Sequence, residues 1–81
     1  MLKTLGSKQH KELISILISK REATGLTQAQ LADALGRYQS FIARLESGHR
    51  RVDVIEFLEL ARILRFEAAP VIHILETINK G

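Results

Sequence analysis

Three glycines divide much of the chain into short segments, and each segment has the apolar spacing of a helix. Gly25, Gly36 and Gly48 each follow a stretch in which apolar residues recur at helical intervals. Glycine readily takes the left-handed backbone conformation that ends many helices, so each is predicted to be a helix stop. There is one Pro, and few aromatic residues are present to indicate strands. The chain is therefore predicted to be all-α.

Capping residues give the starts of the predicted helices. Ser7 is a plausible N-cap, and Thr27 with Gln30 and Asp53 with Glu56 have the spacing of capping boxes. Pro70 is compatible with a helix only in its first turn, where its missing N–H has no acceptor to serve. The helices are expected over residues 8–24, from 28 to about 35, over 38–47, from 54 to about 65, and from 68 or 69 to about 78 or 79.

The inward faces of these helices follow from the same spacing. The second helix is expected to bury Leu31, Ala32 and Leu35, and the third Ile42 and Leu45. The fourth helix is more apolar, and its predicted inward face is Val54, Phe57, Leu58, Ala61 and Leu64, with Leu60 and Ile63 partly buried.

Length and composition exclude several classes of protein. The chain has 81 residues, 46% hydrophobic and 26% charged, which fits one domain over residues 1–81 with a small core. Without Cys there is no disulfide framework and no thiolate zinc site, and the three His are scattered, so neither metal nor cofactor is expected. No apolar run approaches the roughly 20 residues of a membrane span, and no secretory signal is visible. No Ser stands in a nucleophile motif. We expect a cytoplasmic protein that is not an enzyme.

The net charge of +3 is unevenly distributed. Basic residues predominate before Val52, and acidic residues predominate after it. This asymmetry favours a polyanion partner, such as nucleic acid, for the first part of the chain. The alternative is an ordinary small domain a few charges from neutrality.

The segment 28–47 carries the strongest functional signal. Two short helices joined by a tight turn must cross steeply, as in a DNA-binding helix-turn-helix motif. That crossing needs a small residue in the first helix, Gly at the turn and branched apolar residues in the second helix. Ala32, Gly36, Ile42 and Leu45 meet these requirements. The alternative is a plain helical hairpin.

These residues stand in a longer string that resembles a known family. The string LTQAQLADALGRYQSFIARLESGHRRVDVIEFLELARIL is similar to the helix-turn-helix domain of phage-repressor/Cro-like (Xre) transcriptional regulators, over about residues 13–66. The resemblance implies a five-helix bundle (the lambda-repressor-like DNA-binding domain) in a bacterial or phage-encoded protein. It also implies sequence-specific binding to double-stranded operator DNA, usually as a homodimer, and a repressor is the expected role.

The sequence departs from the family pattern at three positions. Tyr38 stands where many relatives have Pro or Ser at the start of the recognition helix, which leaves that helix less well capped. Val52 stands where many have Pro, and Arg65 where Gly usually ends the fourth helix. None of these changes affects the apolar signature. The first puts the details of DNA docking in question.

Four residues of the third helix are predicted to read base edges. In this fold the N-terminal residues of the second helix of the motif lie in the major groove. Gln suits adenine, Arg suits guanine, Ser serves several bases, and the Ala methyl can touch thymine. The candidates on the face opposite Ile42 and Leu45 are Gln39, Ser40, Ala43 and Arg44. The alternative is a solvated helix face. Phe41, beside them, is expected to be partly buried.

Residues at the edges of the motif are predicted to contact phosphates. A helix N-terminus attracts a phosphate through its free N–H groups and its dipole, and basic side chains do so through charge. The candidates are Thr27, Gln28, Arg37, Tyr38, His49, Arg50 and Arg51. The alternative for Arg50 and Arg51 is solubilising charge.

The resemblance also implies a pair between Arg21 of the first helix and Glu46 at the end of the third. Such a pair would orient the recognition helix rather than bind DNA. The alternative is two unrelated surface charges, and even a true pair can add little net stability because desolvation opposes attraction.

The last helix is the predicted dimer seam. Val71, Ile74 and Ile78 are expected to be left over once one face has packed on the bundle. The alternative is that this helix only closes the monomer's core. A second function also stays open, in which the domain docks another protein, for example as the antitoxin of a toxin–antitoxin pair.

Overall fold

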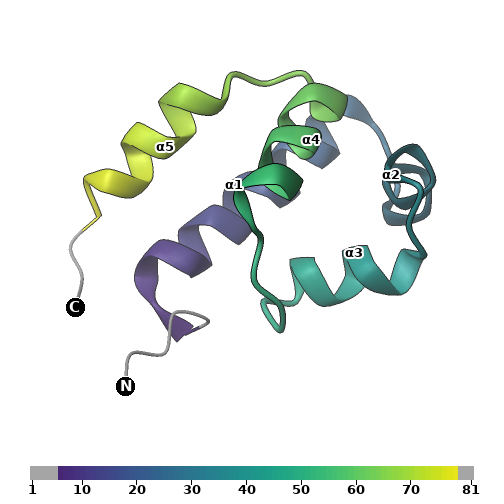
Figure 1. Cartoon of the computed structure of the whole chain (residues 1–81), viewed down its shortest axis with the longest axis horizontal. Coiled ribbons are helices and arrows are strands. Elements are labelled where there is room, and N and C mark those ends of the chain that lie inside the picture. The colour runs from purple at the N-terminus through teal and green to yellow at the C-terminus, as the bar shows by residue number, and fades with distance from the viewer. Residues whose placement is uncertain (1–5, 79–81) are drawn as a thin grey trace.

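The computed structural model describes residues 6–78, and these residues form five α-helices without strands (Figure 1). The helices are α1 (Lys8–Thr24), α2 (Gln28–Leu35), α3 (Gln39–Glu46), α4 (Val54–Leu64) and α5 (Ala68–Glu76). The predicted all-α fold with five helices is confirmed. The last helix is shorter than predicted, because Thr77 already caps its C-terminus. Position 79 lies outside the described residues.

The predicted caps form as the sequence indicates. The Ser7 hydroxyl accepts a hydrogen bond from the His10 N–H, and both capping boxes are complete, at Thr27 with Gln30 and at Asp53 with Glu56. Gly36, between α2 and α3, has a φ of 70°. A side chain there would strain the backbone, so this position requires glycine for the tight turn. Tyr38 caps α3 through its backbone only, as expected from its side chain.

Helix α4 ends at an arginine in the left-handed conformation, where glycine is the usual residue. Arg65 has a φ of 59° and a ψ of 48°, the left-handed region that a Cβ atom disfavours. Arg65 takes the conformation that glycine usually supplies at this point, and its N–H donates to the Ala61 carbonyl. The chain can then turn from α4 toward α5. The departure at Arg65 therefore changes the cost of the turn and leaves the fold intact.

The core takes residues from all five helices. Its centre includes Ile42, Leu45 and Leu60, and Leu31 and Ala32 of α2 are also buried. All these positions were predicted to face inward except Leu60, which was expected to be only partly buried.

The predicted inward face of α4 is wrong at two positions. Val54 and Leu58 are 72% and 47% exposed, whereas Leu60 is fully buried. The helix is rotated so that Phe57, Leu60 and Leu64 enter the core. Its sequence is apolar on more than one face, so spacing alone does not fix this rotation.

Helices α2 and α3 lie at one end of the molecule, and α5 lies at the other (Figure 1). Helix α1 connects the two ends, since it packs against α3, α4 and α5. None of the helices within residues 6–78 is long and apolar enough to span a membrane.

One predicted seam residue belongs to the core of the monomer. Val71 is the buried residue of α5, so the expectation that it is left over after packing is wrong. Ile74 is 44% exposed, as expected. Ile72, on the same helix, is 45% exposed. Ile78, just beyond α5, is partly buried.

Candidate nucleic-acid interface

The outer face of α3 is polar and open to solvent. Ile42 and Leu45 point into the core and fix the rotation of the helix. The opposite face is exposed along its length and carries Gln39, Ser40, Ala43 and Arg44. The structure thus brings the four predicted base-reading residues together on one accessible surface.

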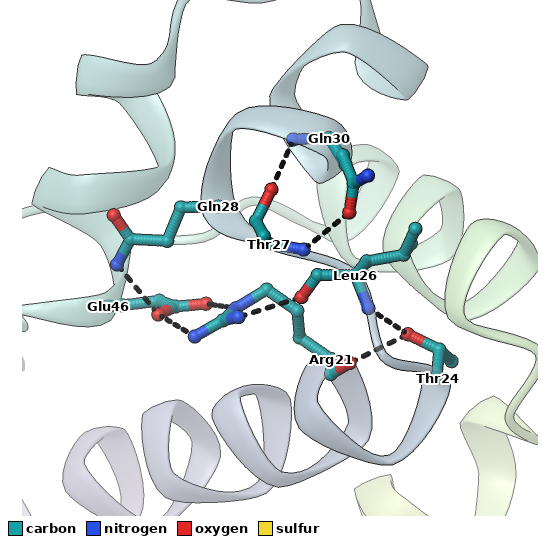
Figure 2. A network of polar contacts seen from close by, with 7 residues as sticks. All are labelled: Arg21, Thr24, Leu26, Thr27, Gln28, Gln30 and Glu46. Atoms are coloured by element: carbon teal, nitrogen blue, oxygen red, sulfur yellow. Dashed lines mark hydrogen bonds and ion pairs between the residues drawn. The ribbon is translucent and has the colours of Figure 1, made fainter.

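A polar network anchors the C-terminal end of α3 to α1 and α2 (Figure 2). Arg21 Nε and Nη2 donate to the two carboxylate oxygens of Glu46, at 2.6 and 3.0 Å. Arg21 Nη1 also donates to the Leu26 carbonyl at 2.8 Å, and Gln28 Nε2 donates to Glu46 at 2.9 Å. The hydrogen bonds to Glu46 raise the pKa of Arg21. The Arg21–Glu46 pair implied by the resemblance is therefore confirmed.

A second group of charged and aromatic side chains lies beside the N-terminal half of α3. We call it the Glu56 cluster, and its members are Arg37, Phe41, Arg50 and Glu56. The Arg37 and Arg50 guanidinium carbons lie 4.4 and 4.3 Å from the centre of the Phe41 ring. Arg50 Nη1 donates to Glu56 Oε1 at 2.8 Å, and Arg37 Nη2 lies 3.7 Å from Glu56 Oε2. Phe41 is partly buried here, as expected.

The predicted phosphate-binding residues fall into two groups. Tyr38, His49 and Arg51 are exposed, and so is Arg37 despite its contact with Glu56. His49 Nδ1 lies 2.8 Å from the Ser47 hydroxyl.

The other three predicted phosphate-binding residues already have partners within the protein. The Thr27 hydroxyl and N–H are both used in the capping box. The Gln28 side chain is bound to Glu46, and Arg50 is bound to Glu56. The N-terminus of α2 at Thr27 and Gln28 still offers backbone N–H groups to a phosphate, whereas Arg50 is engaged with Glu56.

Two buried polar residues were missed by sequence reasoning. Glu56 was predicted only as part of a capping box, and His10 was not predicted to face the core, yet both are buried. His10 Nε2 has no hydrogen-bond partner among the residues that the structure describes. Burial lowers the pKa of His10, opposed by a backbone hydrogen bond with Gly48. The helical spacing of His10, Ile14 and Leu17 was the signal that could have placed it inward.

An open groove lies away from α3. It lies between α1 and α5 and encloses about 700 Å³. Its floor is apolar and includes Ile16, Phe66 and Ile74, and its rim carries charges of both signs. Within residues 6–78 no group of three or more histidine, cysteine, aspartate or glutamate side chains is arranged to hold a metal ion.

Comparisons with known proteins agree with this geometry. A protein-family model described as a helix-turn-helix domain matches residues 19–73. One similar solved structure is an XRE-family like protein from Pseudomonas syringae pv. tomato str. DC3000. It is 38% identical in sequence, with a TM-score of 0.78 over 84% of this chain and 83% of that chain. No curated protein sequence matches the chain.

Proposed function

The chain belongs to the XRE family of helix-turn-helix DNA-binding regulators, and we propose that it is a repressor that binds a palindromic operator as a homodimer. The observation that carries this proposal is the outer face of α3. It is polar, accessible and held at both ends by charged side-chain networks. A helix presented in this way suits insertion into the major groove.

Gln39 and Arg44 are the proposed sequence-reading residues. A Gln amide can form two hydrogen bonds with adenine, and an Arg guanidinium can do so with guanine. Ser40 and Ala43 lie between them on the same face and supply a hydroxyl and a methyl group. Each bidentate pair contributes about 1–3 kcal/mol of discrimination between bases.

Arg51 and Arg37 are the main proposed phosphate contacts. Both side chains are exposed next to the ends of α3. Tyr38 and His49 are also exposed there, and the N-terminus of α2 at Thr27 and Gln28 offers backbone N–H groups and a favourable dipole. These contacts supply affinity and orientation without reading the sequence.

The proposed homodimer uses α5 and its groove with α1. Ile74 lines this groove and is 44% exposed, and the rim carries Glu12, Lys20, Arg65 and Glu67. A rim with charges of both signs can be self-complementary about a two-fold axis. Ile78, the third predicted seam residue, lies just beyond the end of α5 in the sequence. Two copies on DNA would place two recognition helices about 34 Å apart, one helical turn.

Oligomeric state and DNA binding test the homodimer together. Ile74→Lys should give a folded monomer with weaker operator binding, measured by sedimentation, circular dichroism and DNA titration. Leu58→Lys on the exposed face of α4 is the matched control. If Leu58→Lys alone produces the monomer, the seam is on α4 and the α5 proposal is wrong. A wild type that stays monomeric alone and on DNA contradicts the homodimer.

A second candidate function is docking of another protein, as in an antitoxin. The observation in its favour is the exposed apolar surface of Val54, Ile55 and Leu58, which the monomer does not cover. It predicts a chain that stays monomeric alone and forms a stable complex with the product of an adjacent toxin gene.

Selection of duplex DNA from a random pool tests the main proposal. A repressor of this kind should recover a palindromic site. On that site, Arg44→Ala and Gln39→Ala should each cost about 1–3 kcal/mol and relax the preference at one base position. Arg51→Ala should weaken cognate and random DNA alike and make the salt dependence shallower. Equal losses on cognate and random DNA for Arg44→Ala would show that this side chain does not read bases.

A further inference from the structure

The Glu56 cluster joins segments on both sides of α3. Arg37 precedes the helix, Arg50 follows it, and each guanidinium group lies over the ring of Phe41 within the helix. Phe41 directly follows Gln39 and Ser40, two of the proposed base-reading residues. The Arg21–Glu46 network holds the other end of α3. The Glu56 cluster is therefore placed to fix the end of the helix that lies closest to the bases.

Glu56 is the anion at the centre of this cluster. Its residue is only 8% exposed, and its Oε1 accepts hydrogen bonds from Arg50 and from the Asp53 N–H at 2.8 and 3.1 Å. The Arg50 hydrogen bond holds the pKa of Glu56 below its usual range, so the carboxylate is charged at neutral pH. A buried carboxylate needs such partners, because an unpaired charge in this position is strongly destabilising.

Arg50 uses the same side chain for several contacts inside the protein. Its Nη1 donates both to Glu56 and to the Arg51 carbonyl, at 2.8 and 2.9 Å, while its guanidinium lies over Phe41. Arg50 Nη1 is therefore engaged within the protein, and the stacking on Phe41 fixes the orientation of the rest of the guanidinium group. The neighbouring Arg51 side chain is exposed.

We propose that Glu56 is a positioning residue for DNA recognition: it holds Arg37 and Arg50 over Phe41, fixes the N-terminal half of α3, and keeps Arg50 away from the phosphate backbone. This role rests on the proposed DNA-binding function. This role of Glu56 gives two adjacent arginines different functions, although their sequence context does not distinguish them. Arg51 binds DNA, and Arg50 orients α3.

Glu56→Gln tests the positioning role with little change of shape. Gln keeps the capping-box geometry, as Gln30 does in α2, but removes the charge that holds the two arginines. The released Arg50 should reach a phosphate and steepen the dependence of log K on log salt by about 0.9. The ratio of cognate to random DNA affinity should fall about tenfold, the lower range for one good base contact.

Glu59→Gln is the matched control, because it makes the same charge change at an exposed position of α4. It should leave the cognate-to-random ratio within about twofold of wild type. Circular dichroism verifies that both variants fold. A Glu56→Gln variant that behaves like Glu59→Gln overturns the positioning role.

Arg50→Ala supplies a second, independent readout at a less buried position. If Arg50 orients α3, this variant lowers the cognate-to-random ratio and leaves the salt slope unchanged. A slope shallower by about 0.9 would show that Arg50 contacts a phosphate, and the proposal would be wrong. A wild type that binds no duplex DNA refutes both the proposed function and this role. A wild type that selects DNA, with unchanged ratios in Glu56→Gln and Arg50→Ala, refutes this role alone.

Discussion

Removing one partner of the Arg21–Glu46 pair should destabilise this fold strongly, because it leaves the other charge buried without its partner. The side chains of Arg21 and Glu46 are 14% and 7% exposed, and the pair is bidentate. In Arg21→Met the Glu46 carboxylate keeps only the Gln28 amide as a side-chain partner. Breaking a buried ion pair by removing one partner costs about 3–5 kcal/mol. Because water retains some access to Arg21, we expect a loss of about 3 kcal/mol, at the lower end of that range.

Urea and thermal unfolding measure this loss directly. For a domain of this size each 1 kcal/mol shifts Tm by about 4–8 °C, so Arg21→Met should lower Tm by about 12–24 °C. The urea midpoint should fall while the slope m stays constant, because the native fold and its buried surface are retained. Circular dichroism at pH 7 follows both transitions.

Two controls separate the ion pair from other effects of the substitution. Arg62→Met makes the same change at an exposed position of α4 and should shift stability by no more than about 0.5 kcal/mol. Arg21→Met combined with Glu46→Leu replaces both charges by apolar groups and should recover most of the loss. If Arg21→Met and Arg62→Met are equally mild, the pair does not stabilise the fold and the reasoning is refuted.

Two further predictions concern positions outside the candidate nucleic-acid interface. Arg65→Gly should raise the free energy of unfolding by about 1 kcal/mol, because glycine tolerates the left-handed conformation. Arg62→Gly within α4 is the control and should lower the free energy of unfolding by about 1 kcal/mol, because glycine weakens a helix. Thermal unfolding measures both changes. The lowered pKa of His10 means that the unfolded chain binds its proton more readily, so stability should fall as pH drops below the ordinary value of 6.5 toward the folded pKa. Urea titrations at several pH values measure this fall in stability. His10→Leu should remove the pH dependence, and His73→Leu, at an exposed position, should retain it. Equal behaviour of the two variants would contradict the assignment of the pH dependence to His10.

Features that depend on neighbouring residues could be predicted from the amino-acid sequence. The capping boxes at Thr27 and Asp53 and the glycine turn at Gly36 are formed within a few residues of chain, so their chemistry can be recognised without a fold. The helix-turn-helix signature fixed which residues of α3 point inward, since its apolar positions occupy one face. The Arg21–Glu46 pair could also be predicted, but only from the resemblance to a family.

The rotation of α4 and the partners of its buried Glu56 carboxylate follow from packing between helices and could not be predicted from sequence. Helix α4 carries apolar residues on several sides, so Val54 and Leu58 were as plausible in the core as Leu60 until α1 and α2 were packed against it. Adjacent arginines likewise have the same intrinsic chemistry. Arg50 differs from Arg51 because packing places the Glu56 carboxylate and the Phe41 ring beside it. Charge pairing in a folded chain depends on how its helices and loops are oriented against one another, and that orientation is set by the whole core.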